Sequence, residues 1–181
     1  TIEDRGIEWF KKELNNRLGR VLESSREVTF DATTDRYGWT QDHEGKWHYC
    51  LFVEGGRLRD FDGVNAKSAI REIAKIHSGD FRLSPNQNLI VARVDDANKA
   101  EVEKILADHG LSDSGKLSGL RLNSIACTAL PTCGLALAES ERYLPNLVDE
   151  LEKVIDDLGI REESIAIRST GCPNGCGRPY L

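Results

Sequence analysis

The sequence predicts an α+β fold in which helices pack on one face of a mainly antiparallel sheet. Three observations lead to this prediction. Short runs rich in aromatic and β-branched residues alternate with segments of helical period, and most links between neighbouring runs are as short as those of hairpins. Strands followed by a helix, and then strands and a helix again, are typical of a sheet with its helices on one side.

The first predicted helix spans residues 7–18, where apolar side chains recur at helical spacing and Gly19 follows as a stop. Residues 21–36 show no sustained period and are expected to form a connector. Two strands are expected next, a short aromatic run at 37–40 and a longer one at 47–53 that is rich in aromatic and β-type residues.

The Glu54-Gly55-Gly56 sequence predicts a turn into residues 57–61, so that 47–53 and 57–61 are expected to pair as a hairpin. The following run, 66–77, has its alanines and isoleucines at helical spacing. We expect Gly79 to close this helix as a C-terminal cap.

Two further strands are expected at 81–83 and 88–94, separated by a Ser-Pro-Asn-Gln turn. Asp96 is then expected to cap a helix that runs to Asp108, and Gly110 is expected to stop it.

The pattern changes after the Ser- and Gly-containing stretch 111–120, which is the best candidate for a domain boundary. Beyond it the sequence predicts a helix over 134–144 and a second helical segment that begins at Pro145 and ends at Gly159. Residues 164–168 are expected to form a strand that leads into a turn rich in cysteine and glycine.

Composition excludes several classes of protein. The net charge of −6 is mild and its charges are interspersed, so no basic stripe indicates a nucleic-acid partner. No apolar run is long enough to span a bilayer, and no secretory signal is present, which favours the cytoplasm and no membrane partner. The sequence lacks Met and stops soon after its last cysteine motif, so we expect a segment of a longer protein.

Four of the five cysteines form two spaced pairs. Five residues separate Cys127 from Cys133, and three separate Cys172 from Cys176. Four thiolates from two segments can hold a four-iron cluster, whereas zinc pairs usually enclose two to four residues. The spacing therefore favours an iron–sulfur cluster over structural zinc, with free or redox-active thiols as a third possibility. Cys50 lies apart and is expected to be a small core residue.

The residues around these cysteines resemble a known family. The segments 127–142 (CTALPTCGLALAESER) and 170–179 (TGCPNGCGRP) are similar to the paired signature of the sirohaem- and four-iron-containing sulfite and nitrite reductases. The runs 7–10 (IEWF), 37–39 (YGW) and 73–88 (IAKIHSGDFRLSPNQN) resemble the haemoprotein subunits of the NADPH-type assimilatory sulfite reductases. This resemblance covers nearly the whole chain and favours sulfite over nitrite.

The resemblance implies a role for each cysteine. Cys127, Cys133, Cys172 and Cys176 would ligate a [4Fe-4S] cluster, and Cys176 would also bridge the cluster to the iron of sirohaem as its axial ligand. The whole enzyme would reduce sulfite to sulfide with six electrons in sulfur assimilation, and a flavoprotein reductase subunit or a ferredoxin would supply them. The alternatives are a sirohaem-dependent nitrite reductase, and a non-catalytic iron–sulfur or zinc-bound module.

Further cofactor contacts are expected from polar side chains near the motifs and in one loop of the sheet. The residues that we expect to contact the cofactors are Gln87, Asn88, Asn174, Arg82 and Arg178. Arg168 is a further basic residue that could pair with a carboxylate of the macrocycle.

The resemblance also implies a division into domains. Residues 1–35 would be the end of a preceding domain and a connector, and 36–111 a ferredoxin-like half-unit. Residues 112–181 would be the start of the cluster- and sirohaem-binding α+β domain. Because the family's anion-gripping residues lie upstream, the isolated segment is expected to be inactive.

Overall fold

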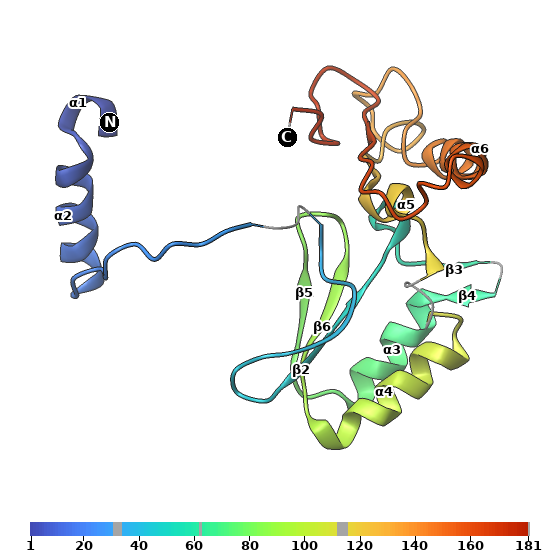
Figure 1. Cartoon of the computed structure of the whole chain (residues 1–181), viewed down its shortest axis with the longest axis horizontal. Coiled ribbons are helices and arrows are strands. Elements are labelled where there is room, and N and C mark those ends of the chain that lie inside the picture. The colour runs from blue at the N-terminus through green and yellow to red at the C-terminus, as the bar shows by residue number, and fades with distance from the viewer. Residues whose placement is uncertain (31–33, 62, 112–115, 181) are drawn as a thin grey trace. The chain divides into compact units, whose positions relative to one another are not determined.

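The computed structural model describes residues 1–30, 34–61, 63–111 and 116–180 (Figure 1). Its contacts divide the chain into two compact units, Thr1–Thr33 and Thr34–Leu181. The first unit contains the short helix α1 (Ile2–Arg5) and the predicted helix α2 (Ile7–Leu18). Gly19 ends α2 in the left-handed conformation, with φ of 66°, as the sequence predicted.

The second unit begins with an antiparallel sheet of four strands in the order β1-β2-β6-β5. Its strands, in chain order, are β1 (Gly38–Gln41), β2 (Trp47–Leu51), β5 (Asp80–Leu83) and β6 (Leu89–Val94). Two helices, α3 (Ala66–Ile76) and α4 (Asp96–Asp108), lie along this sheet (Figure 1). The predicted α+β fold is therefore confirmed.

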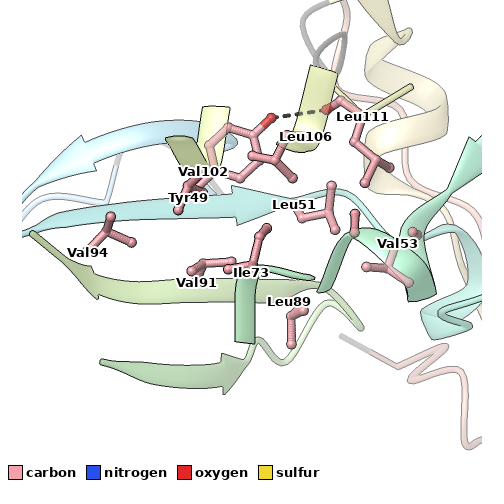
Figure 2. Close-up of a cluster of buried hydrophobic side chains, with 12 residues drawn as sticks. Tyr49, Leu51, Val53, Ile73, Leu89, Val91, Val94, Val102, Leu106 and Leu111 are labelled. Carbon is pink, nitrogen blue, oxygen red and sulfur yellow. Dashed lines mark hydrogen bonds between the residues drawn. The ribbon is translucent and has the colours of Figure 1, made fainter. Parts of the chain in front are cut away.

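The sheet and its two helices share one apolar core (Figure 2). Tyr49 and Leu51 of β2 and Leu89 and Val91 of β6 enter this core with the period of two of a strand, and an irregularity at Arg93, with φ of 64°, shifts the alternation so that Val94 enters it as well. The helices contribute fully buried side chains such as Ile73 and Leu106. The Tyr49 hydroxyl lies in this core and donates to the Leu111 carbonyl across 3.2 Å, which ties the chain beyond α4 to the sheet.

The predicted hairpin between 47–53 and 57–61 is wrong. Both edges of β2 are already occupied, because β2 pairs with β1 on one side and with β6 on the other. The glycines form a short 3₁₀ turn, η1 (Glu54–Gly56), and β3 (Asp60–Phe61) pairs instead with β4 (Val64–Asn65).

Two predicted helix caps differ in the structure. His77, in extended conformation, follows α3 as its C-cap, and Gly79 instead lies so close to the backbone of β6 that a Cβ there would be 2.3 Å from the Ala92 oxygen. Asp95 is the N-cap residue of α4, while the Asp96 carboxylate accepts a hydrogen bond from the Trp47 indole. Gly110 follows α4 with φ of 75°, as predicted for the stop.

The rest of the second unit is built around α6 (Leu144–Asp157), which has Pro145 in its first turn, as predicted. The other elements are α5 (Gly119–Asn123), β7 (Ile125–Ala126) and β8 (Arg168–Ser169). Their apolar side chains form a second buried cluster that includes Leu120, Leu144 and Val148. Residues 112–115 of the expected boundary lie outside the described residues, and the domain limits stay a prediction.

The helix expected over 134–144 is not formed. Residues 134–143 are a series of turns, because backbone amides of this segment donate to carbonyls elsewhere rather than to each other: Leu137 and Ala138 both donate to Gly171. The strand expected over 164–168 is reduced to β8, which pairs in parallel with β7. Among the described residues, no helix combines the length and the apolar character needed to cross a membrane.

Candidate functional site

A two-strand parallel ribbon brings the two cysteine segments together. Ile125 and Ala126 of β7 pair with Arg168 and Ser169 of β8. Because the strands are parallel, the segments that follow them leave the ribbon at the same end. Cys127 follows β7 directly, and its amide donates to the Ser169 carbonyl across 3.1 Å. The chain after β8 then runs into the second cysteine pair.

The two cysteine loops are also joined by direct hydrogen bonds. The amides of Leu137 and Ala138 donate to the Gly171 carbonyl at 2.9 and 3.2 Å, and the Gly171 amide donates to the Cys127 sulfur at 3.2 Å. A Cβ at position 171 would lie 2.6 Å from that of Ala129, so only glycine permits this approach. The close packing of the loops therefore depends on Gly171.

All four motif cysteines are free thiols; Cys176 is exposed and the other three are partly buried. Among the described residues, no group of three or more His, Cys, Asp or Glu side chains is placed to hold a single metal ion. A four-iron cluster takes one sulfur for each iron, and amides that donate to those sulfurs tune its potential. The donor set and the amide directed at Cys127 fit such a cluster, although the four thiols do not converge on one point.

Cys50 differs from these four cysteines in its surroundings. It lies on β2 and is only 5% exposed, as expected for a core residue. Burial raises the pKa of its thiol to about 12. Cys50 therefore packs within the sheet.

Gln87, one of the predicted contact residues, lies beside the first cysteine. It adopts φ of 67° in the turn between β5 and β6, and its Nε2 donates to the Ala126 carbonyl across 2.8 Å. Ala126 directly precedes Cys127 in the chain. This contact places the β5–β6 turn next to the β7–β8 ribbon.

Asn88 is 1% exposed, and its amide group is engaged within the protein. Its Oδ1 accepts from the Val53 amide at 2.9 Å, and its Nδ2 donates to Asp35 at 2.7 Å and to the Tyr37 hydroxyl at 3.1 Å. Burial raises the pKa of Tyr37 to about 12. The hydroxyl of Tyr37 in turn donates to the Leu122 carbonyl, so this buried network connects the sheet to α5.

Arg178 and Arg168 form a pair of cations beside the second cysteine loop. Arg178 donates to the Asn86 side chain at 2.8 Å, and Arg168 donates to the Asn123 carbonyl at 2.7 Å. The Arg168 Nε is buried, and no hydrogen-bond partner for it is found among the described residues. Burial, followed by the nearby Arg178 cation, lowers the pKa of Arg168. An anionic group would be stabilised here.

The remaining predicted contact residues are exposed. Arg82 lies on the edge strand β5 and donates to the Asp80 carboxylate at 3.3 Å. Asn174 lies between Cys172 and Cys176 in the second loop. Whether these side chains contact a cofactor stays a prediction.

Sequence reasoning missed four ion pairs made by Arg57 and Arg121, and two of them, Arg57–Glu141 and Arg121–Glu54, join the two cores of the second unit. Arg57 pairs with Glu141, and Arg121 pairs with the acidic side chains of Glu54, Asp149 and Glu152. Although burial opposes it, contact with Glu152 and Asp149 raises the pKa of Arg121. No spacing in the sequence marks these partners, because each pair joins segments that are far apart in the chain.

A groove of about 610 Å³ is lined in part by the residues of these ion pairs. It is lined by residues of the segment from η1 to β3, of α5, and of α6 and the segment before it, including Arg57, Arg59, Arg121 and Arg142. None of the cysteines is among the residues that line it. Glu141, whose amide donates to the Cys127 carbonyl, does line it.

Comparison with known proteins adds three findings. Residues 40–109 match the nitrite/sulfite reductase ferredoxin-like half domain. The sulfite reductase [NADPH] hemoprotein beta-components of Staphylococcus carnosus and Bacillus subtilis are 54% and 52% identical over all 181 residues. The chain spans 32% of the length of each of these relatives.

A solved structure, that of the Mycobacterium tuberculosis NirA protein, is similar over 98% of this chain and 32% of that chain. The TM-score is 0.68 and the sequence identity 26%. The matched half domain, the cysteine loops and the likeness to these relatives along the full chain agree with one another. Residues 40–109 therefore match the half domain of the nitrite and sulfite reductases, and the whole chain is similar to about a third of the hemoprotein beta-components of the NADPH-type sulfite reductases.

Proposed function

We propose that this chain supplies the cluster-binding part of an oxidoreductase that reduces sulfite to sulfide. The observation that carries the proposal is the 54% identity to a sulfite reductase hemoprotein beta-component along the entire chain, together with four free cysteines on two adjoining loops. In this proposal Cys127, Cys133, Cys172 and Cys176 ligate a [4Fe-4S] cluster. The exposed Cys176 would also hold a sirohaem through its iron.

When bound, these cofactors would supply the electron storage and the metal at which sulfite is reduced. The chain's own residues would orient them. The β7–β8 ribbon aligns the two cysteine loops, and the Gly171 amide donates to the Cys127 sulfur. The cations Arg168 and Arg178 would balance negative charge on the cofactors, and Gln87 would hold the backbone that precedes Cys127.

The electron donor and the compartment belong to the same proposal. The relatives carry NADPH in their names, so we expect a flavoprotein reductase subunit as donor, with a ferredoxin as the alternative. Sulfite is the expected substrate. We expect the enzyme to act in the cytoplasm, because reduced cysteines persist there.

Anaerobic purification of the full-length protein tests the proposal. The expected result is a coloured protein with sirohaem absorption bands, five irons for each chain (four in the cluster and one in sirohaem), and sulfide release from sulfite with reduced viologen as donor. A colourless protein that contains zinc would contradict it. Faster turnover of nitrite than of sulfite would identify a nitrite reductase instead.

The bridging role of Cys176 has its own test. Cys176→Ser in the same protein should separate the magnetic and optical signals of the two cofactors, because a serine hydroxyl is a poor thiolate substitute. Cys50→Ser is the matched control, since the Cys50 thiol is buried in the sheet. Unchanged coupling in the Cys176 variant would refute the bridge.

A further inference from the structure

An ion pair between the two cores of the second unit is connected to Cys127 by a single backbone hydrogen bond. Arg57 Nε donates to Glu141 Oε1 at 2.8 Å, and Arg57 Nη2 donates to Oε2 at 2.7 Å. The Glu141 side chain is only 8% exposed, while that of Arg57 is 41% exposed. A bidentate guanidinium–carboxylate pair fixes orientation as well as distance.

The electrostatics of this pair keep the carboxylate charged. The hydrogen bonds from Arg57 lower the pKa of Glu141, and the nearby cations Arg59 and Arg142 act in the same direction. Contact with Glu141 in turn raises the pKa of Arg57. Both partners are therefore ionised at neutral pH.

The backbone of Glu141 carries the effect of the pair to the cysteine. Its amide donates to the Cys127 carbonyl across 3.0 Å. The preceding residue, Ser140, is fully buried; its hydroxyl donates to that of Ser169, and its carbonyl accepts from the first residue of α6. A displacement of Glu141 would therefore move Cys127 relative to β8 and α6.

A two-glycine turn brings a second contact to the same place. A Cβ at Gly55 would lie 2.7 Å from the Glu141 Cγ, and one at Gly56 would lie 3.1 Å from the Gln87 Cβ. Gln87 is the residue whose amide donates to the Ala126 carbonyl. The turn thus fits closely over the side chains of the two residues, Glu141 and Gln87, that hydrogen-bond to the backbone of Cys127 and Ala126.

We propose that Arg57 is a positioning residue for Cys127. Acting through Glu141, and together with Gln87, it fixes the first cysteine loop against the second loop. The sheet-and-helix half of the unit thereby sets the geometry of the metal centre, although Arg57 touches neither a thiol nor a cofactor. This inference rests on the proposed ligation of a cluster by Cys127.

Substitution in the full-length protein, loaded with its cofactors under anaerobic conditions, tests the inference. Arg57→Gln should shift the cluster's midpoint potential, change its electron paramagnetic resonance spectrum, and release iron to a chelator about tenfold faster. Arg57→Lys keeps the charge but not the bidentate geometry, so its three readouts should lie between those of Arg57→Gln and of the wild type. Arg161→Gln is the matched control, because Arg161 is exposed to a similar degree and pairs with Asp156 at the opposite end of α6 from Glu141, so it should leave all three readouts unchanged.

A second measurement needs no cofactor. In the cofactor-free full-length protein, alkylation followed by peptide mapping should show about tenfold faster labelling of Cys127 in Arg57→Gln, with Cys50 labelled as slowly as in the wild type. If Cys50 also becomes reactive, the variant has unfolded. The comparison is then made with Arg57→Lys and Gln87→Leu, which should each speed the labelling of Cys127 alone.

The outcomes separate the two proposals. A wild-type protein that takes up no cluster contradicts the proposed function, while the alkylation rates still test the positioning. A wild type that loads normally, with an Arg57→Gln variant that melts earlier but matches it in potential, spectrum and labelling, overturns the positioning role. In that case Arg57 only stabilises the fold.

Discussion

Arg178 Nη2 donates a hydrogen bond of 2.8 Å to Asn86 Oδ1, which joins the segment after the last cysteine to the turn between β5 and β6. Asn86 is itself held by the Asp35 carboxylate at 3.0 Å. The second cysteine loop therefore has an anchor on the sheet through Arg178, just as Gln87 anchors the first.

Loss of the Arg178 contact should loosen the second cysteine loop more than the rest of the fold. In Arg178→Gln we expect faster hydrogen exchange at the amides of residues 172–177, with a loss of about 0.5–1.5 kcal/mol in the free energy of unfolding. Mass-spectrometric exchange checks this. Arg82→Gln, which removes an exposed pairing with Asp80, should leave exchange in that loop as it is.

Substitution by alanine should lower the free energy of unfolding at Gly171 and leave it almost unchanged at Gly134. In Gly171→Ala, the added methyl group would meet Ala129 and the Ala138 oxygen at 2.6 and 2.7 Å, so we expect a loss of about 1–3 kcal/mol in the free energy of unfolding. In Gly134→Ala the methyl group would meet nothing within 4 Å, and the change should stay within about 0.5 kcal/mol. Urea unfolding measures both, and equal losses would contradict the packing that we describe.

The turn before β2 should show a measurable dependence on pH. The hydrogen bond from His48, together with backbone amides, lowers the pKa of Asp42 from 3.8 to about 2. Since the folded pKa is depressed, the stabilisation by the carboxylate is complete above about pH 4 and is lost as the pH falls toward about 2. The difference in Tm between wild type and Asp42→Asn should shrink across this range. A constant difference would rule out the ionised Asp42 carboxylate as the cause of this stabilisation.

The cysteines should differ sharply in reactivity when no cofactor is bound. A thiol with a pKa of about 12, as at Cys50, is ionised to only about one part in ten thousand at a pH of about 8, and it is also shielded by the sheet. The exposed Cys176 should therefore be alkylated first and Cys50 last. Peptide mapping over time tests the order, and early labelling of Cys50 in folded protein would be incompatible with this structure.

Local patterns predicted the helices of the sheet-containing half well. In α3 the apolar positions Ala66, Ala69 and Ile73 that suggested a helix are those that the core buries. The partner of β2 was not predicted, because hairpin signals are local, whereas β2 lies between β1 and the more distant β6. Both edges were already occupied, so the run after Gly56 formed another ribbon.

Around the cysteines the sequence was less informative. Residues 134–144 contain good helix formers, but their amides bond to Gly171 on the other loop, and this tertiary contact overrides propensity. Glu141 fell within the helix expected over 134–144. Its actual partner, Arg57, lies on a different segment, and nothing in a single sequence marks such a pair. The roles of the cysteines stay a prediction.

The parallel ribbon of β7 and β8 has a consequence for the order of events during folding. It joins two segments that lie on either side of α6, so it can form only after the chain has passed α6 and returned to β7. Contacts between distant segments close late, because the chain must first lose the entropy of the intervening loop. The first cysteine pair would therefore be synthesised and exposed well before the second pair is synthesised and brought beside it. A cofactor delivered during synthesis would meet half a site, and complete insertion would have to wait for the ribbon to close.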